Sequence, residues 1–349
     1  MSLQTISPRA LLDRYAEFDT VIDARSESEY ELDHLPNALN WPTLRDSERQ
    51  AVGTMYKQVN AFEAKKRGAA IAARNIATYI EAHVLDKPRD WRPLAYCWRG
   101  GKRSGALALI LDQIGFRVSM VEGGYKAFRA EMLLDMERLA RRLQFKVICG
   151  TTGSGKTRLL QALADAGAQV LDLEALAQHR SSVLGAIPGL AQPSQKRFDT
   201  LVWEALRSFD PARPVFVESE SKKVGNVAIH TELLVAMRAS PCVFIDLPLP
   251  ERVALLLEDY AFFLANPDYF CARLDALTAQ RGKATVQDWK DAVHRGDFAS
   301  VVRALLTEHY DPVYLKSMER NFRQCAQARR LNLSDRSDAA MRQAAATLI

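Results

Sequence analysis

A cysteine stands at the centre of the first segment whose residue types could do chemistry. Residues 96–104 read YCWRGGKRS, and the apolar run at 93–96 predicts a short buried strand that ends just before Cys97. The N–H groups of a Gly-Gly loop, the N-terminus of the helix expected after it and three cations all favour a thiolate over a thiol. The sequence therefore predicts a nucleophile in an anion-binding loop; the alternative is a buried cysteine that only fills space. The residues expected to hold the anion are Arg99, Gly100, Gly101, Lys102 and Arg103.

The second chemical segment is a phosphate-binding loop. Residues 150–157 read GTTGSGKT, between an apolar strand-like run at 145–149 and a helical pattern from 158 to about 166. This is the G-x4-G-K-T motif in the strand–loop–helix context that a P-loop requires. Its lysine supplies a positive charge to terminal phosphates, and the hydroxyl of Thr157 can ligate Mg²⁺. The residues predicted to bind a diphosphate are Gly150, Thr151, Thr152, Gly153, Ser154, Gly155, Lys156 and Thr157.

A P-loop protein also needs a carboxylate at the end of a neighbouring strand, where it orients a metal ion or a water molecule. The very apolar run at 214–217 leads directly into Glu218, which is the first candidate. The second candidate is Asp172, in a run at 170–174 that is expected to be a strand ending in carboxylates. For each residue the alternative is a carboxylate that only caps a helix or a turn.

Two α/β domains are expected to position these motifs. Strand-like runs alternate with helical patterns in both halves of the chain, which predicts parallel sheets with each loop at the carboxyl end of a strand. A basic, helix-patterned segment at about 50–83 belongs to the first domain. We expect a first domain at 1–130, a linker helix at 131–143, and a P-loop domain at 144–349. The last hundred residues of that domain are expected to form a helical extension.

Composition restricts the class of protein. The 349 residues contain no run of about 18 uncharged apolar residues, and the N-terminus has no signal-peptide pattern, so we expect a cytoplasmic protein without a membrane partner. Its five cysteines include no C-x-x-C pair, which argues against a disulfide framework and a structural zinc site. The net charge of +5 permits a polyanionic partner but does not demand one.

The first domain resembles the rhodanese family. The segments DAR at 23–25, HLPNA at 34–38 and EGGYKAF at 122–128 are similar to the signatures of that family. The loop of Cys97 is similar to the loop that carries the persulfide, although Asp33 and Asn37 stand where the family usually has glycines. The resemblance implies an α/β fold with a parallel sheet, and a loop cysteine that carries sulfur or selenium.

The same loop also fits a different chemistry. Cys97 and Arg103 have the Cys-x5-Arg spacing of cysteine-dependent phosphatases. In those enzymes the arginine binds the phosphoryl oxygens bidentately while the cysteine attacks phosphorus. The spacing therefore leaves chalcogen transfer and phosphate hydrolysis open, and both predict room for a tetrahedral oxyanion of phosphate size.

A rhodanese-like domain followed by a P-loop domain in one chain resembles the bacterial tRNA 2-selenouridine synthase family. The similarity covers nearly the whole chain and includes both loops, DLE at 172–174, QPSQ at 192–195 and ESES at 218–221. The chain departs from the family pattern after the His-Arg pair at 179–180, where Ser181 replaces an expected glycine and Leu184 an expected aromatic residue.

This resemblance implies a transferase that replaces sulfur by selenium in 2-thiouridine at the wobble position of the tRNA anticodon. The implied co-substrates are selenophosphate and geranyl diphosphate, which forms an S-geranylated intermediate, and Mg²⁺ is a candidate cofactor. Under this interpretation Cys97 takes selenium or assists its delivery, and the cations of its loop, Arg103 among them, hold selenophosphate. The P-loop would bind the diphosphate, and the enzyme that produces selenophosphate is a candidate partner.

Two other functions stay open on the residues alone. A regulatory or binding protein could couple a rhodanese-like sulfurtransferase module to an ATP-driven switch, and it would hydrolyse ATP without modifying tRNA. A phosphatase could instead be fused to a kinase-like domain, and Cys97→Ser would then abolish the release of phosphate from a phosphoester.

Overall fold

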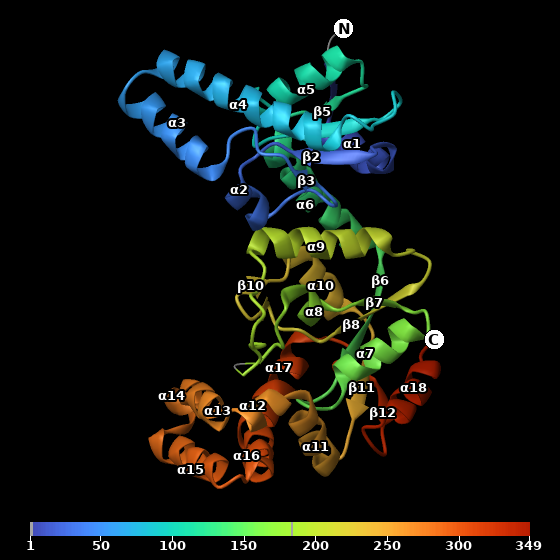
Figure 1. Ribbon diagram of the computed structural model, residues 1–349. Coiled ribbons are helices and arrows are strands. Elements are labelled where there is room, and N and C mark those ends of the chain that lie inside the picture. Colours follow the sequence, from blue (N-terminus) through green and yellow to red (C-terminus); the bar gives the residue numbers. More distant parts are fainter. Residues whose placement is uncertain (1–2, 183) are drawn as a thin grey trace. The chain divides into compact units, whose positions relative to one another are not determined.

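The computed structural model describes residues 3–182 and 184–349, which form two units (Figure 1). The first contains the chain up to Met136 together with Asp199–Glu204, and the second contains Glu137–Phe198 and Ala205–Ile349. Each unit has a parallel sheet with helices, which confirms the predicted fold class. The predicted linker helix at 131–143 falls mostly within a longer helix, α6 (Gly124–Arg142), and the domain boundaries stay a prediction.

The sheet of the first unit has the strand order β1-β5-β4-β2-β3, and all its paired strands run parallel. All four residues of its central strand, β4, are buried, so its short apolar run is covered on both faces. Cys97 follows at the carboxyl end of this strand. The strands are β1 (Gln4–Ile6), β2 (Thr20–Asp23), β3 (Leu39–Asn40), β4 (Pro93–Tyr96) and β5 (Ser119–Val121).

The helices of this unit pack around an apolar core that includes Ile22, Ile76, Leu107 and Leu111. Each such side chain contributes about 2 kcal/mol when it leaves water. The basic segment at 50–83 is two helices rather than one, because Asn60 accepts hydrogen bonds from two N–H groups of the next turn and starts a new helix. The helices are α1 (Pro8–Arg14), α2 (Glu27–Leu32), α3 (Asp46–Gln58), α4 (Ala61–His83), α5 (Lys102–Ile114) and α6.

The sheet of the second unit has the order β12-β11-β6-β8-β7, again parallel throughout. Two expectations are corrected here. The run at 170–174 is not one strand, because β7 ends at Leu171 and a short helix begins at Leu173. The C-terminal extension contains an edge strand, whose largely exposed side chains give no apolar signal. The strands of this sheet are β6 (Gln144–Cys149), β7 (Gln169–Leu171), β8 (Pro214–Glu218), β11 (Cys242–Asp246) and β12 (Arg329–Asn332), and β9 (Lys223–Val224) and β10 (Val227–Ala228) form a separate antiparallel pair.

The C-terminal helices of this unit include a subdomain with an apolar core of its own, formed by residues such as Phe263, Phe270, Leu274 and Trp289. None of the helices in the described ranges is both long and apolar enough to span a membrane. The helices are α7 (Lys156–Asp165), α8 (Leu173–Ala177), α9 (Gln195–Ser208), α10 (Thr231–Ala239), α11 (Leu249–Asp259), α12 (Ala261–Ala265), α13 (Pro267–Leu274), α14 (Thr278–Arg281), α15 (Lys283–His294), α16 (Phe298–Ala304), α17 (Asp311–Asn321) and α18 (Asp338–Ala346).

Candidate functional site

The loop that carries Cys97 joins β4 to α5 and packs tightly against the turn after β5. Gly124 has φ +62°, and a Cβ atom there would lie 2.3 Å from the carbonyl oxygen of Cys97. The N–H of Tyr125 donates to that same carbonyl at 2.8 Å. Only glycine tolerates such close backbone contact at this φ, so the EGGY segment fixes the shape of the loop.

The thiol of Cys97 is the acceptor of two hydrogen bonds. The N–H of Gly101 and the hydroxyl of Ser104 each lie 3.3 Å from its sulfur, and the residue is only 4% exposed. Burial raises the pKa of the Cys97 thiol, but the hydrogen bonds from Ser104 and Gly101 and the charge of Arg103 outweigh it, so the pKa is lowered. These contacts favour the thiolate. The sequence indicated no role for Ser104, because residue spacing does not show that its hydroxyl points toward the sulfur of Cys97.

Arg103, predicted to hold an oxyanion, is paired with a carboxylate. Its guanidinium makes two hydrogen bonds to the carboxylate of Glu29, at 2.6 and 3.2 Å, and Arg49 lies 3.7 Å from the same carboxylate. Burial raises the pKa of Glu29, but its ion pair with Arg103 keeps that pKa below its usual value. An incoming oxyanion must therefore share Arg103 with Glu29, whereas Arg99 and Lys102 are exposed beside the loop.

The residues of the DAR segment form a buried support rather than part of the loop. The guanidinium of Arg25, 1% exposed, donates to both carboxylate oxygens of Asp23, and the Tyr96 hydroxyl donates to Asp23 at 2.7 Å. The same guanidinium lies 4.0 Å from the ring centroid of Tyr125. This cluster ties β2, β4 and the EGGY segment together. Asn37, which replaces a glycine of the family, keeps the left-handed backbone that glycine would allow, with φ +51°.

In the second unit β6 leads through the P-loop into α7. Gly153 and Gly155 have φ values of +75° and +86°, which only glycine adopts readily. The ammonium of Lys156 folds back across the loop and donates to the carbonyls of Gly150 and Thr151 at 3.1 and 3.3 Å. Burial lowers the pKa of Lys156, but neighbouring acidic groups raise it above its usual value, so the lysine stays charged.

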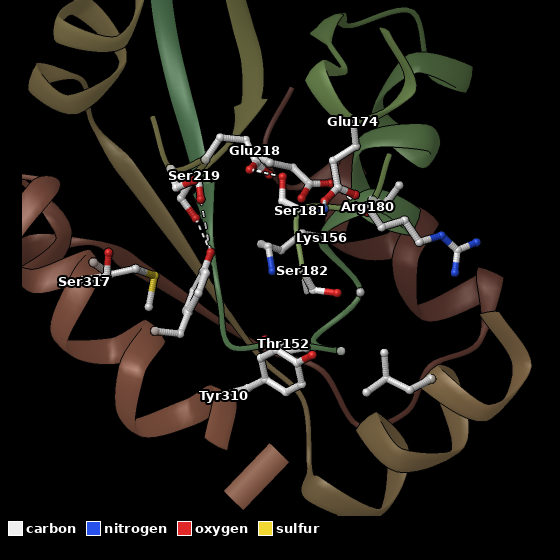
Figure 2. A pocket seen from close by; sticks show the side chains of 18 of the residues that line it. Thr152, Lys156, Glu174, Arg180, Ser181, Ser182, Glu218, Ser219, Tyr310 and Ser317 are labelled. Carbon is white, nitrogen blue, oxygen red and sulfur yellow. Dashed lines mark hydrogen bonds between the residues drawn. The ribbon is translucent and has the colours of Figure 1, made fainter. Parts of the chain in front are cut away.

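Three carboxylates gather beside the P-loop threonine. Glu218, at the end of β8 as predicted, accepts a hydrogen bond from the Thr157 hydroxyl at 2.7 Å. Glu174 and Glu220 join it, and one oxygen from each of the three lies within 4.8 Å of the others. Figure 2 shows Glu174, Glu218 and Ser181 close together above Lys156. These are hard oxygen donors of the kind that Mg²⁺ prefers, and the Thr157 hydroxyl fits as a further ligand.

The second predicted carboxylate has a different position. Asp172 accepts a hydrogen bond from the N–H of Ala175 at 2.9 Å and so caps α8, the alternative that the sequence left open. Because this cap starts a helix directly after β7, Glu174 rather than Asp172 reaches the cluster. The DLE and ESES segments contain all of these carboxylates. The prediction of a strand at 170–174 did not show that Glu174, and not Asp172, points toward Glu218.

Burial and mutual repulsion change the acidity of the cluster. Burial and the neighbouring Glu174 raise the pKa of Glu218 well above its usual value and that of Glu220 to about 7. Ser181, at the position where a glycine was expected, donates its hydroxyl to Glu220 and its N–H to Glu174. Near neutral pH this cluster can take up or release a proton, or exchange protons for a cation.

The P-loop, the carboxylates and α17 enclose a cavity of about 570 Å³ (Figure 2). An apolar recess of about 50 Å³ adjoins it, and both are lined by Thr152, Leu256 and Tyr260. Leu184 lines the recess, so this departure from the family pattern faces apolar space. The recess is further lined by Phe263, Phe270, Val302, Leu305 and Leu306.

Comparison with known proteins adds the family to this geometry. The sequence model described as tRNA 2-selenouridine synthase AAA domain matches residues 143–273, and that of the rhodanese-like domain matches residues 7–131. The chain is 30% identical to the tRNA 2-selenouridine synthase of Nitrosomonas europaea, over 86% of this chain and 89% of that protein. The chain belongs to the tRNA 2-selenouridine synthase family.

Other tRNA 2-selenouridine synthases agree with this assignment. That of Bdellovibrio bacteriovorus is also 30% identical, over 92% of this chain and 94% of its own length. Among solved structures, a rhodanese-related protein from Thermoplasma volcanium covers 37% of this chain and 92% of its own, at 20% identity and a TM-score of 0.25. The two family models and the two curated relatives confirm the resemblance inferred from the two loops.

Proposed function

We propose that this chain is a tRNA-modifying transferase that replaces sulfur by selenium in wobble 2-thiouridine, in two half-reactions. The observation that carries the proposal is membership of the tRNA 2-selenouridine synthase family over nearly the full length of the chain, with both loops in place. The proposed compartment is the cytoplasm, and the enzyme that produces selenophosphate is a candidate partner there.

In the first half-reaction the sulfur of 2-thiouridine attacks the allylic carbon of geranyl diphosphate. The carbon–oxygen bond breaks, diphosphate leaves, and the base loses its N3 proton. Lys156 and the P-loop N–H groups would stabilise the negative charge that develops on the leaving group, and Lys156 lies across the loop where the diphosphate would bind. The proton passes to water. The apolar recess beside Thr152 supports an isoprenoid substrate, since the end of the chain can enter it while the rest lies in the adjoining cavity and the diphosphate lies on the loop.

The cluster of Glu174, Glu218 and Glu220 with Thr157 would hold Mg²⁺ in this scheme. A cation bound there would neutralise charge on the diphosphate. The fit rests on the donors themselves. Burial raises the pKa values of these three carboxylates, and their mutual repulsion raises them further despite the charge of Lys156, so a cation would relieve the repulsion.

In the second half-reaction selenium from selenophosphate becomes bonded to C2 of the base. The bond between C2 and sulfur breaks, geranyl thiol leaves, and water cleaves the selenium–phosphorus bond to release phosphate. The Cys97 loop suits a phosphate-sized oxyanion, and the lowered pKa of its thiol supplies a thiolate that assists the delivery of selenium. Arg99 and Lys102 are exposed at this loop and can approach the phosphoryl oxygens.

Mass analysis of nucleosides tests the proposal. Purified protein is incubated with 2-thiouridine-containing tRNA and geranyl diphosphate, and selenophosphate is then added. The expected products are S-geranyl-2-thiouridine and then 2-selenouridine. If tRNA and both donors give no mass change while ATP is hydrolysed, the proposal fails and the ATP-driven switch is favoured.

Two variants assign the half-reactions. Lys156→Ala should reduce geranylation at least 100-fold, since it removes the only side-chain cation of the P-loop motif, whereas Lys283→Ala, an exposed lysine of the same unit, should leave it unchanged. Cys97→Ser should preserve geranylation and stop selenium incorporation. Selenouridine formed at the wild-type rate by Cys97→Ser would show that the thiolate has no role.

A further inference from the structure

The helices α3 and α4 form an antiparallel hairpin that extends away from the sheet of the first unit (Figure 1). Its outer part, residues 50–74, contains five lysines and arginines and one glutamate, a net charge of +4. The whole chain has a net charge of +5. This 25-residue segment therefore has a net charge nearly as large as that of the whole 349-residue protein. The basic residues are Lys57, Lys65, Lys66, Arg67 and Arg74.

The tip of the hairpin exposes large apolar side chains beside these charges. Tyr56 is 52% exposed, Val59 76% and Phe62 66%. The ammonium of Lys66 lies 5.1 Å from the ring centroid of Phe62. Exposed aromatic rings interleaved with lysine and arginine are the combination that binds nucleic acid, because the rings stack on unpaired bases and the cations bind phosphates.

The base of the hairpin is fixed to the domain next to the Cys97 loop. Asp46, at the start of α3, accepts hydrogen bonds from the backbone and the hydroxyl of Ser28, at 2.9 and 2.6 Å. One turn further on, Arg49 pairs with Glu29, the carboxylate that binds Arg103 of the Cys97 loop. A surface that begins at Arg49 therefore starts at the rim of the loop and continues along the hairpin.

The reach of the hairpin follows from helix geometry. In α4, Asn75 donates to the Thr43 carbonyl and to Glu48, so the helix is still tied to the base of the hairpin at this point. From Asn75 to Phe62 a rise of 1.5 Å per residue gives a length of roughly 20 Å. Between these two points the helices pack on each other, with Val52 of α3 against Gly68 of α4.

We infer that the α3–α4 hairpin is an RNA-binding arm that holds the tRNA body while the wobble nucleotide occupies the Cys97 loop. The inference rests on the proposed function for its choice of tRNA as the polyanion. Charge complementarity supports this occupant, since a tRNA carries one negative charge per nucleotide and the arm has a net charge of +4. The arm supplies affinity and leaves the chemistry to the loop at its base.

The test compares two variants with the same change in charge. Lys65→Glu with Arg67→Glu reverses two exposed cations on the arm. Arg89→Glu with Arg117→Glu reverses two exposed cations that come before β4 and β5, at the opposite end of the sheet from Cys97. The dissociation constant of full-length 2-thiouridine-containing tRNA is measured by fluorescence anisotropy over a series of salt concentrations, and circular dichroism confirms that each variant is folded.

We expect the arm variant to bind tRNA at least tenfold more weakly and to lower the slope of log affinity against log salt by roughly 1.5, the loss of two phosphate contacts. Its kcat at saturating tRNA should stay near the wild-type value, and Lys65→Gln with Arg67→Gln should have an intermediate affinity. The control pair should bind within twofold of the wild type.

The outcomes separate this inference from the proposed function. An arm variant that binds as tightly as the wild type, or a control pair that loses equal affinity, overturns the inference even if selenouridine is formed. A wild-type protein that binds tRNA but never modifies it overturns the proposed function and leaves the comparison of the variants valid. A wild-type protein that does not bind tRNA overturns both.

Discussion

Removal of the Ser104 hydroxyl is the sharpest test of how the first loop activates its cysteine. In the folded protein this hydroxyl donates to the sulfur of Cys97 at 3.3 Å, and both residues are buried, so little water can replace it. A hydrogen bond to a charged group contributes about 1.5–3 kcal/mol. Ser104→Ala should therefore raise the pKa of Cys97, because the bond stabilises the thiolate and not the thiol.

The size of the effect follows from the thiolate population. At a pH below the pKa, each 1.4 kcal/mol lowers the fraction of thiolate tenfold, so alkylation of Cys97 should slow by about 10- to 100-fold. The rate is measured against pH with iodoacetamide and read by mass spectrometry of the peptide that contains Cys97. Peptide resolution is needed because hydrogen bonding by Cys149 lowers the pKa of the half-buried Cys325 to about 7, so that thiol also reacts.

The control is Ser47→Ala, which removes an exposed hydroxyl from α3 and should leave the profile unchanged. If the alkylation profiles of Ser104→Ala and the wild type coincide, the hydrogen bond does not set the reactivity. The helix N-terminus and the N–H of Gly101 would then be its main cause.

Three further predictions follow from buried groups. Burial and Glu174 raise the pKa of Glu220 to about 7, so Mg²⁺ should bind more tightly as the pH rises through 7 and the carboxylate ionises, which isothermal titration calorimetry would show; Glu220→Gln should abolish this rise, and a variant that retained it would contradict the role of Glu220 as a ligand. Asp23→Ala should lower the free energy of unfolding by about 3–5 kcal/mol because it leaves Arg25 buried without its partner, as chemical denaturation would show. Glu17→Ala, which breaks the exposed pair with Arg14, is its control, and equal effects of the two would argue against the buried pair. Gly124→Ala should reduce selenium incorporation and spare geranylation, since its Cβ would lie 2.3 Å from the Cys97 carbonyl. Gly53→Ala, with open space around it, should leave both reactions unchanged. Full selenium incorporation by Gly124→Ala would refute the close packing.

The chemical motifs were readable because each is contiguous. In a P-loop the phosphate ligands are successive backbone N–H groups and adjacent side chains, so eight residues in order define the site. The Cys97 loop is readable for the same reason. Glu218 could be placed because a carboxylate directly after a very apolar strand must emerge at the sheet edge where the P-loop lies. The fold class followed from the alternation of strand-like and helical runs.

The partners of these groups depend on long-range packing. Nothing in the sequence indicated that Glu29, 74 positions before Arg103, binds the guanidinium of that arginine. Glu174 meets Glu218 and Glu220 only because the Asp172 cap starts α8 directly after β7. The strand β12 contains exposed arginines, and its composition does not indicate a strand. It is a strand because it pairs with β11 at the edge of the sheet.

The sequence by itself determined which groups could react: a loop cysteine, a P-loop lysine and threonine, and a strand-end glutamate. These assignments depend on short-range backbone geometry, which a few adjacent residues dictate. The tertiary structure decided what surrounds each group: the Ser104 hydroxyl on the thiol, the carboxylate on Arg103, the three-glutamate cluster and the apolar recess. These contacts join residues distant in the chain, and their pKa shifts arise from burial and Coulomb interactions that exist only once the chain has folded.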